Sequence, residues 1–404
     1  MSDAENTVSG RTGFSFPKAA PDGFIAAVLL SFLATAGLFY VNILGALVEG
    51  LVKGLSFSDE TAGFVASANV YGAAIGAFIA VFSVKRLPWR RTAIVVLIAL
   101  MTIDLISTQI SNSNIMIPVR LFHGMVGGFL VGTGFSVIAR TKSPDRTFGM
   151  LLFVQYGLGG VGLKFLPEMV PVYGVSVLFL ALLAFSLVTL LMVPFIADYP
   201  PRKHSLQKIA PKAGIMWRPL SFVLVAIFLF QAANMGIAAY IFRLGESYGL
   251  VIDTMSNQLG LANWIAMSGA AVVYLVGIRY GRLFPMLAGL VVTAVGLALF
   301  HWSDNSSWFF VANIITGITW AFMMPYLFGM CAEFDAEGQM AALSGFFSKM
   351  GLASGPMLVA LMVRSGDYSL IINMSIVGII LCLLAVFMPA RLIDRQSNLS
   401  SITE

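Results

Sequence analysis

Three charged side chains interrupt long apolar stretches, and their positions most suggest chemistry. Asp104, Arg120 and Lys349 each lie inside a stretch that is otherwise nearly free of charge. A charge near the middle of a bilayer costs about 2.5–3.5 kcal/mol on insertion scales, so such residues usually face a protein interior or a partner. These three residues are therefore the first candidates for a functional site.

Asp104 and Arg120 lie on either side of a predicted turn at Ser111–Asn114. Each is eight residues from Asn112, so at a rise of 1.5 Å per residue both lie about 12 Å from the turn and could form an ion pair. We predict that Arg120 lines a central cavity and binds an anionic group, with Asp104 as a protonatable partner. The alternative is a static pair that locks two helices. His123, one turn from Arg120, is a candidate for proton coupling or a packing residue.

Polar and aromatic residues at helical spacing form a second group of candidates. Gln231 and Asn234 are one turn apart, and Asn313, Thr316 and Trp320 follow the spacing of one helix face. A polar and aromatic lining suits a solute with an apolar body and a few polar groups, although each aromatic residue alone is more often a packing residue. The candidates for substrate binding, besides Arg120 and Lys349, are Tyr40, Asn42, Gln155, Gln231, Asn234, Asn313, Trp320 and Tyr326.

The elements that must position these residues are predicted from the scarcity of charge. The 404-residue chain is 58% hydrophobic and only 11% charged, and its mean hydropathy is +0.89. An ordinary soluble domain is roughly 25% charged, so soluble enzymes, nucleic-acid binders and disordered proteins are excluded as first interpretations. The uncharged runs suit helices of about 20 residues rather than barrel strands, and they predict an all-α membrane protein with twelve transmembrane helices. One helix is predicted to end near residue 110 and the next to begin near residue 115. Residues 338–363 are predicted to form one helix, interrupted only by the charge of Lys349.

The basic residues predict the orientation of these helices. With the N-terminus inside, 18 of the 24 Lys and Arg residues fall on the cytoplasmic side, as the positive-inside rule requires. The acidic loop 333–338 departs from the rule and could pair with the basic loop 85–91. The predicted parts are a cytoplasmic tail (1–22), a first six-helix bundle (23–197), a cytoplasmic linker (198–218), a second six-helix bundle (219–390) and a cytoplasmic tail (391–404).

The two halves show traces of an internal duplication. Gly72 in the second helix aligns with Gly269 in the eighth at an offset of 197 residues, and Gly124 aligns with Gly317 at an offset of 193. Gln155 aligns with Lys349 at an offset of 194, so we predict that these two residues face one another across a central site. The alternatives are a helix–helix hydrogen bond for Gln155 and a snorkelling side chain for Lys349.

Over about residues 22–390 the chain resembles the major facilitator superfamily. Arg120-x-x-His123-Gly124-x-x-Gly127-Gly128 is similar to the motif in that family's fourth helix, with His123 where Gln is usual. The segment 82–91 keeps the final Arg pair of the loop motif but lacks its Asp and Gly residues, and the fifth helix lacks the Gly-Pro of the antiporter motif. The resemblance implies two pseudo-symmetric six-helix bundles, with helices 1, 4, 7 and 10 lining a cavity.

Other patterns are interpreted as structural. The glycine run 157–162 matches a dinucleotide-binding pattern by letter but lies in an apolar stretch without the required strand and acid, so we predict close helix packing. Cys331 and Cys382 have no disulfide or zinc spacing. No catalytic, metal-binding or nucleotide-binding motif is present, so we expect neither an enzyme nor a cofactor.

These observations favour a secondary active transporter that moves a small organic solute by alternating access. The two buried bases favour an organic anion such as a carboxylate, with coupling to a proton gradient. The alternatives are an efflux pump for lipophilic or cationic compounds, for which Glu49 is the other embedded acid, and a receptor that does not transport. We expect a monomer in the lipid bilayer of a bacterial inner (plasma) membrane, with no nucleic-acid partner.

Overall fold

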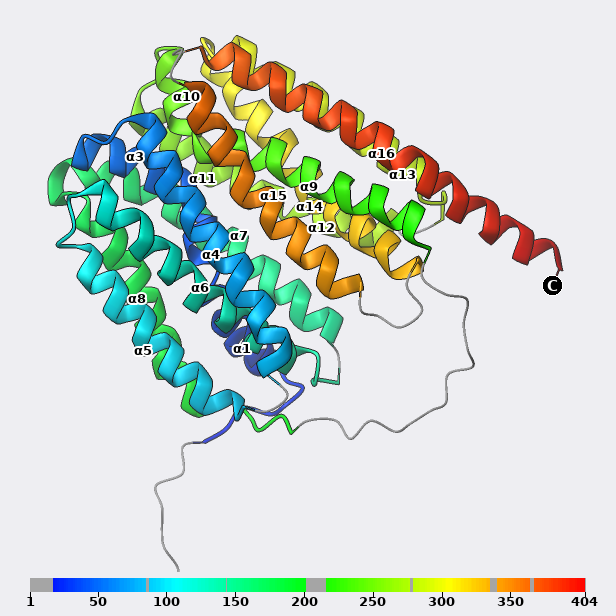
Figure 1. Cartoon of the computed structure of the whole chain (residues 1–404), viewed down its shortest axis with the longest axis horizontal. Coiled ribbons are helices and arrows are strands. Elements are labelled where there is room, and N and C mark those ends of the chain that lie inside the picture. The colour runs from blue at the N-terminus through cyan, green and yellow to red at the C-terminus, as the bar shows by residue number, and fades with distance from the viewer. Residues whose placement is uncertain are drawn as a thin grey trace, which may run out of the picture.

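The computed structural model describes residues 17–84, 87–142, 144–200, 216–276, 279–334, 340–363 and 367–403. These residues form a bundle of helices, and the part of the chain that the structure describes contains no strand (Figure 1). Nine of the described helices are long and apolar enough to cross a membrane. The predicted linker lies mostly outside the described residues, as do the predicted N-terminal tail up to residue 16 and parts of several loops.

The first half of the chain forms eight α-helices and one 3₁₀ turn. Their bounds are α1 Phe24–Ala36, α2 Phe39–Asn42, α3 Leu44–Leu55, α4 Asp59–Ser83, α5 Trp89–Ser107, α6 Ser113–Ile138, α7 Pro144–Tyr173, α8 Ser176–Met192 and η1 Val193–Phe195. The Oγ atom of Ser58 caps α4 by accepting a hydrogen bond from the Thr61 backbone N–H, and two acids follow in the first turn. Asn112 caps α6 in the same way, so the predicted turn between α5 and α6 is confirmed.

The second half repeats this arrangement. Its helices are α9 Trp217–Ala239, α10 Ile241–Ser247, α11 Ile252–Ala266, α12 Ser268–Val276, α13 Leu283–Leu299, η2 Phe300–Trp302, α14 Ser306–Glu333, α15 Met340–Met362 and α16 Tyr368–Thr403. The predicted single helix around Lys349 is confirmed as α15. The α16 helix continues through the segment 391–403 that the sequence assigned to a tail. Taken in order, α1–α3, α9–α10 and α11–α12 each make one interrupted pass, which is consistent with twelve passes.

Equivalent glycines make equivalent contacts in the two halves. A Cβ on Gly72 of α4 would meet the Leu121 backbone of α6, and a Cβ on Gly124 of α6 would meet the Asn69 backbone of α4. In the second half, a Cβ on Gly269 would meet the Ile318 backbone, and one on Gly317 would meet Ala266. Small residues let helix backbones approach closely, as in membrane GxxxG contacts. The structure therefore supports the duplication that the offsets predicted.

The first and seventh passes are interrupted at equivalent residues. Ile43 separates α2 from α3 with φ −114° and ψ 20°, and Tyr240 separates α9 from α10 with φ −108° and ψ 16°. Both backbones lie near the bridge region rather than in the α region. Their offset is again 197 residues. The short helices α3 and α10 beyond these interruptions pack against each other.

One end of the bundle, which we call the basic end, carries Lys18, Arg90, Arg140, Arg218 and Arg282. Arg90 donates to the carbonyl of Val193 at 2.8 Å and to Asp198 at 3.0 Å. The equivalent Asp394 accepts hydrogen bonds from the backbone N–H groups of Arg282 and Leu283. Hydrogen bonding to Lys18 is the main cause that holds the pKa of Asp198 below its usual value; burial opposes it, and the hydrogen bond from Arg90 adds to the lowering. At the basic end, these contacts therefore join residues of the same half.

The predicted pairing of loops 85–91 and 333–338 can be followed only in part. Glu333 forms an ion pair with Arg282 at 2.7 Å, within the second half, and Arg90 pairs within the first half. Residues 85–86 and 335–339 lie outside the described residues. The described parts of the two loops therefore bind their own halves.

Candidate functional site

The first half encloses a cluster of charged side chains between α5 and α6. Arg120 Nη1 lies 2.9 Å from Asp104 Oδ1, and neither side chain is exposed to solvent. The Arg120 guanidinium also donates to the Ser107 hydroxyl and lies 4.8 Å from the ring centroid of Phe179 on α8. The ion pair that their equal depth makes possible is present in the structure. A buried pair needs additional hydrogen bonds to offset its desolvation, and Ser107 supplies one.

His123 and Asn69 extend this cluster to α4. His123 Nε2 lies 3.2 Å from Asp104 Oδ1, and its Nδ1 lies 2.8 Å from Asn69 Nδ2. If Asn69 donates to Nδ1, the ring proton of a neutral His123 must lie on Nε2 and point at Asp104. Tyr40 lies beside the ring, with centroids 6.0 Å apart. The cluster therefore contains an acid, a base and a proton donor in contact, which is a set that can exchange a proton.

This cluster is closed to solvent in the present conformation. Arg120 and Asp104 are fully buried and His123 is 6% exposed. Contact between Arg120 and a solute would therefore need a change of conformation. Ser107 was not among the predicted site residues, and no polar spacing on α5 pointed to it.

A neutral polar cluster occupies the second half. Gln231 Nε2 donates to Ser348 Oγ at 2.7 Å, and Trp320 Nε1 donates to Gln231 Oε1 at 2.8 Å. These contacts join α9, α14 and α15. Lys349 follows Ser348 on α15, is half-buried at mid-depth, and forms no ion pair with any residue that the structure describes. A fixed polar group thus lies beside an uncompensated cation.

Other predicted site residues make local contacts. Asn234 and Asn313 each donate to the carbonyl four residues earlier, at 2.8 Å, and Tyr326 is buried at 4% exposure. Asn42 donates to the backbone carbonyl of Gln155 at 3.2 Å. The Gln155 side chain is half-buried at mid-depth on α7, and its predicted apposition with Lys349 stays a prediction.

The two halves meet along two helix pairs, α4 with α15 and α7 with α11 (Figure 1). Tyr71 and Ser354 join the first pair by a hydrogen bond of 2.8 Å. Asn263 and Trp264 of α11 donate to the backbone carbonyls of Tyr156 and Gly157, at 2.7 and 2.9 Å. By the repeat, these are equivalent interfaces.

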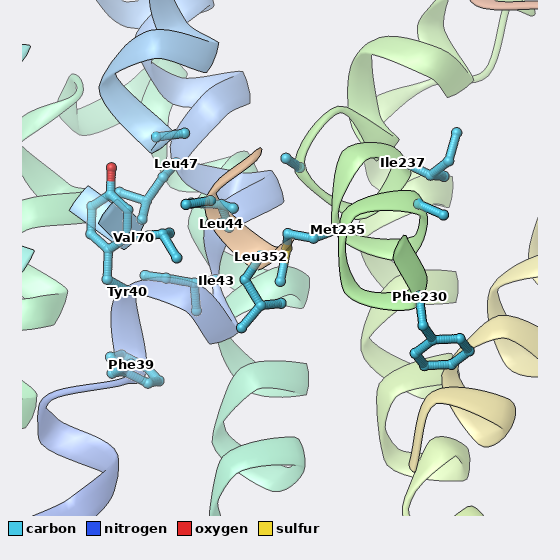
Figure 2. Packing of buried hydrophobic residues seen from close by; sticks show 14 of the residues in the cluster. Phe39, Tyr40, Ile43, Leu44, Leu47, Val70, Phe230, Met235, Ile237 and Leu352 are labelled. Atoms are coloured by element: carbon cyan, nitrogen blue, oxygen red, sulfur yellow. The ribbon is translucent and has the colours of Figure 1, made fainter. Parts of the chain in front are cut away.

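Apolar packing accompanies these contacts. A Cβ on Gly160 would meet Trp264, so the prediction that the glycine run serves helix packing is confirmed. Figure 2 shows Leu44 and Leu352 among the buried apolar residues between the halves, with Met235 nearby. Buried apolar side chains therefore pack between the halves at the level of Leu44 and Leu352.

At the end opposite the basic end, which we call the far end, ion pairs join the two halves. Asp59 accepts a hydrogen bond from Arg243 Nε at 2.8 Å and another from the Tyr368 hydroxyl at 3.1 Å. Lys53 lies 2.9 Å from Glu246, and Arg243 also pairs with Glu246. Among the described residues, every ion pair that joins the two halves lies at this end. The two halves are therefore in contact at the far end, which is closed. The sequence did not predict these ion pairs, because their partners are about 190 residues apart.

Comparison with known proteins gives a consistent assignment. The family model of the Major Facilitator Superfamily matches residues 25–360. The fold is similar to a crystal structure of the nucleoside transporter NupG, with TM-score 0.69 and 14% identity over 90% of this chain and 99% of that chain. It is also similar to a bacterial homologue of the human lysosomal transporter Spinster in an inward-facing, unoccupied conformation, with TM-score 0.71 and 12% identity over 92% and 97%. No curated protein matches the sequence.

Proposed function

The chain belongs to the major facilitator superfamily, and from this premise we propose that it is a secondary active transporter that moves a small organic solute by alternating access. The matched interfaces α4–α15 and α7–α11 support this proposal, because they are surfaces on which two similar halves can rock. The closed far end supports a conformation in which the solute site faces the basic end.

We place the solute site at mid-depth between the halves, and Lys349 is the observation that carries this assignment. Lys349 is half-buried in the middle of α15 and has no acidic partner among the described residues. An intramembrane cation without a partner is a functional-site candidate by default. Such a cation favours an anionic solute, and the Gln231–Trp320–Ser348 cluster beside it would orient a polar or aromatic part of that solute.

Proton coupling is assigned to the Asp104–Arg120–His123 cluster. Protonation of Asp104 would weaken its pair with Arg120 and free that guanidinium to turn away from α5. His123 contacts the same carboxylate through Nε2 and would deliver its Nε2 proton to Asp104, taking up a replacement proton at Nδ1 once the Asn69 amide turns its oxygen toward the ring. We therefore expect Arg120 to act in coupling, and to contact solute only after Asp104 is protonated.

The charge distribution supports an orientation with the basic end in the cytoplasm. Both termini then lie on that side, as does the linker between the halves. We propose that the protein is a monomer, because each six-helix half covers the interface of the other. We also propose that it lies in a bacterial inner membrane.

Uptake into proteoliposomes tests the proposed function. The panel should include organic carboxylates, nucleosides and lipophilic cations, each with and without an imposed inward proton gradient. We expect uptake of a carboxylate that rises with the gradient. Uptake that ignores the gradient would refute proton coupling, and transport of lipophilic cations alone would favour the efflux alternative.

The Lys349→Gln variant tests the site itself. Loss of a charge-assisted hydrogen bond, at about 1.5–3 kcal/mol, should lower the affinity for an anionic solute about tenfold or more. Lys164→Gln is the matched control, because Lys164 is a half-buried cation on α7 that lies 5.3 Å from the Phe165 ring centroid. Equal solute affinity in the two variants would show that the site is elsewhere.

A further inference from the structure

Glu49 is a buried acid without a partner at the closed far end. It lies on α3, six residues beyond the interruption at Ile43, and is 2% exposed. Neither carboxyl oxygen accepts a hydrogen bond from any residue that the structure describes. A buried ionised carboxylate without hydrogen bonds is strongly disfavoured, so this side chain needs an explanation.

The equivalent residue in the second half is also an acid, but it is fully paired. Glu246 lies six residues beyond the interruption at Tyr240, so the offset between Glu49 and Glu246 is again 197. Glu246 forms ion pairs with both Lys53 and Arg243. The repeat therefore places two carboxyl groups at one interface and supplies cations to only one of them.

The charges around Glu49 are already balanced without it. The charged groups that act on it are Lys53 on its own helix, Asp59 at the start of α4, and Arg243 and Glu246 on α10. Those two cations and two anions pair with one another. A third anion at Glu49 would be surplus.

The other neighbours of α3 offer no compensation. The Tyr368 hydroxyl of α16 faces this group of charges but donates to Asp59. A Cβ on the neighbouring Gly50 would meet Val170 of α7 and Leu178 of α8, which are apolar, and one on Gly45 would meet the Ala238 backbone of α9. The surroundings therefore favour a neutral side chain at Glu49.

We propose that Glu49 is a proton-binding site, occupied when the far end is closed and emptied when the far end opens. A metal ion would need several oxygen ligands, and no group of three or more His, Cys, Asp or Glu residues suited to a metal occurs among the described residues. A proton neutralises the surplus charge and requires no further ligand. This site is separate from the Asp104 cluster, which lies within one half.

Opening of the far end links this proton to the conformation. Alternating access, on which this inference rests, must separate α3 and α4 from α10, which breaks Asp59–Arg243 and Lys53–Glu246 and admits water to Glu49. The closed state then binds one more proton than the open state. By linkage, the ratio of closed to open molecules falls as pH rises, by at most about tenfold per pH unit for one proton.

Distance measurements between the two halves test the proposal. Spin labels at Gln109→Cys and Ser307→Cys report the far end, since both positions are exposed there and lie in different halves. The native cysteines, both buried, are replaced by Ala. Double electron–electron resonance in lipid nanodiscs from pH 5 to 9, without solute, measures the closed fraction.

Three variants sharpen the measurement. Glu49→Gln mimics the protonated acid and should remain closed at every pH. Glu246→Gln removes two ion pairs and should open the far end. The same Glu-to-Gln change is therefore expected to have opposite effects at these two equivalent positions. Glu168→Gln on α7 is the matched control and should behave as the wild type.

The result that overturns the proposal is a wild-type closed fraction that does not change with pH, or a Glu49→Gln variant that keeps the full response. Infrared difference spectra give a second readout that does not depend on opening. A carboxylic-acid carbonyl band present in the closed wild type and absent in Glu49→Gln is expected. Uptake that does not depend on a proton gradient would refute the coupling role of the Asp104 cluster. It would leave the spin-label and infrared results unchanged, so failure of the proposed function can be distinguished from failure of the Glu49 proposal.

Discussion

The contacts within the first half and the contacts between the halves are built differently. Within the first half, α4 and α6 touch backbone to backbone at glycines, and the Asp104–Arg120 pair is fully buried. Between the halves at the far end, Arg243 and Asp59 are each 21% exposed and pair through single contacts. The first kind of contact is expensive to break and the second is not. This difference supports the proposed alternating access, in which one rigid half would move against the other where the contacts between them are weak.

Removal of Arg120 should separate the two kinds of contact most clearly. Arg120→Ala leaves Asp104 buried without its cation, and breaking a buried pair in this way costs about 3–5 kcal/mol. We expect a loss of that size in the free energy of unfolding, measured by denaturation in detergent. Asn313→Ala, at the aligned position of α14, is the control and should cost about 1 kcal/mol, since it loses one hydrogen bond to its own helix. The double variant Asp104→Asn with Arg120→Gln should recover much of the loss.

A methyl group at Gly124 should have the next largest effect. The added Cβ of Gly124→Ala would overlap the carbonyl of Asn69 on α4, and overpacking of this kind costs about 1–3 kcal/mol. Gly149→Ala on α7 is the control, because nothing lies within 4 Å of its Cβ and helix propensity favours Ala. A variant at Gly124 as stable as wild type would show that α4 and α6 can separate easily.

A change at the joint should shift the conformation while leaving stability nearly unchanged. Arg243→Gln removes the contacts to Asp59 and Glu246, which are partly exposed and together contribute about 1 kcal/mol. We expect the ratio of closed to open molecules to fall about fivefold, measured with the far-end spin labels. Lys142→Gln, whose ion pair with Asp22 lies within the first half, should leave that ratio unchanged. A large loss of stability in Arg243→Gln would contradict the distinction between the two kinds of contact.

The smallest effect is expected from acid at the basic end. Hydrogen bonding to Lys142 lowers the pKa of Asp22, and hydrogen bonding to Lys18 lowers that of Asp198, both from the ordinary value of 3.8. A lowered pKa contributes stability above the unfolded value, and this contribution is lost as pH falls through the lower folded value. This contribution is therefore fully present between pH 5 and 8, and thermal unfolding should show no pH dependence from these two residues in that range. Asp198→Asn should remove part of the loss below about pH 4.

The sequence predicted the parts of this molecule that depend on local pattern. Uncharged runs predicted the helices. Equal depth from one turn showed that Asp104 and Arg120 could pair, because α5 and α6 are joined by a short loop. The offsets that paired Gly72 with Gly269 predicted equivalent helix contacts, which the structure supports.

Partners from distant segments could not be predicted in this way. Gln231, Ser348 and Trp320 come from three helices, and Asp59 and Arg243 come from opposite halves. Their meeting depends on how whole helices pack, which no spacing within one helix encodes. The sequence also placed Arg120 beside a cavity, whereas the structure encloses it against Phe179 in the present conformation.

The matched interruptions at Ile43 and Tyr240 bear on how the chain diverged after its duplication. The two positions share a backbone conformation, yet one is a branched aliphatic residue and the other a phenol whose hydroxyl donates to the Asp59 carbonyl. The two halves therefore share the bend, while only Tyr240 adds a hydrogen bond to the opposite half. In this chain the internal repeat can therefore be recognised from where the two helices break, although different residue types stand at the two breaks.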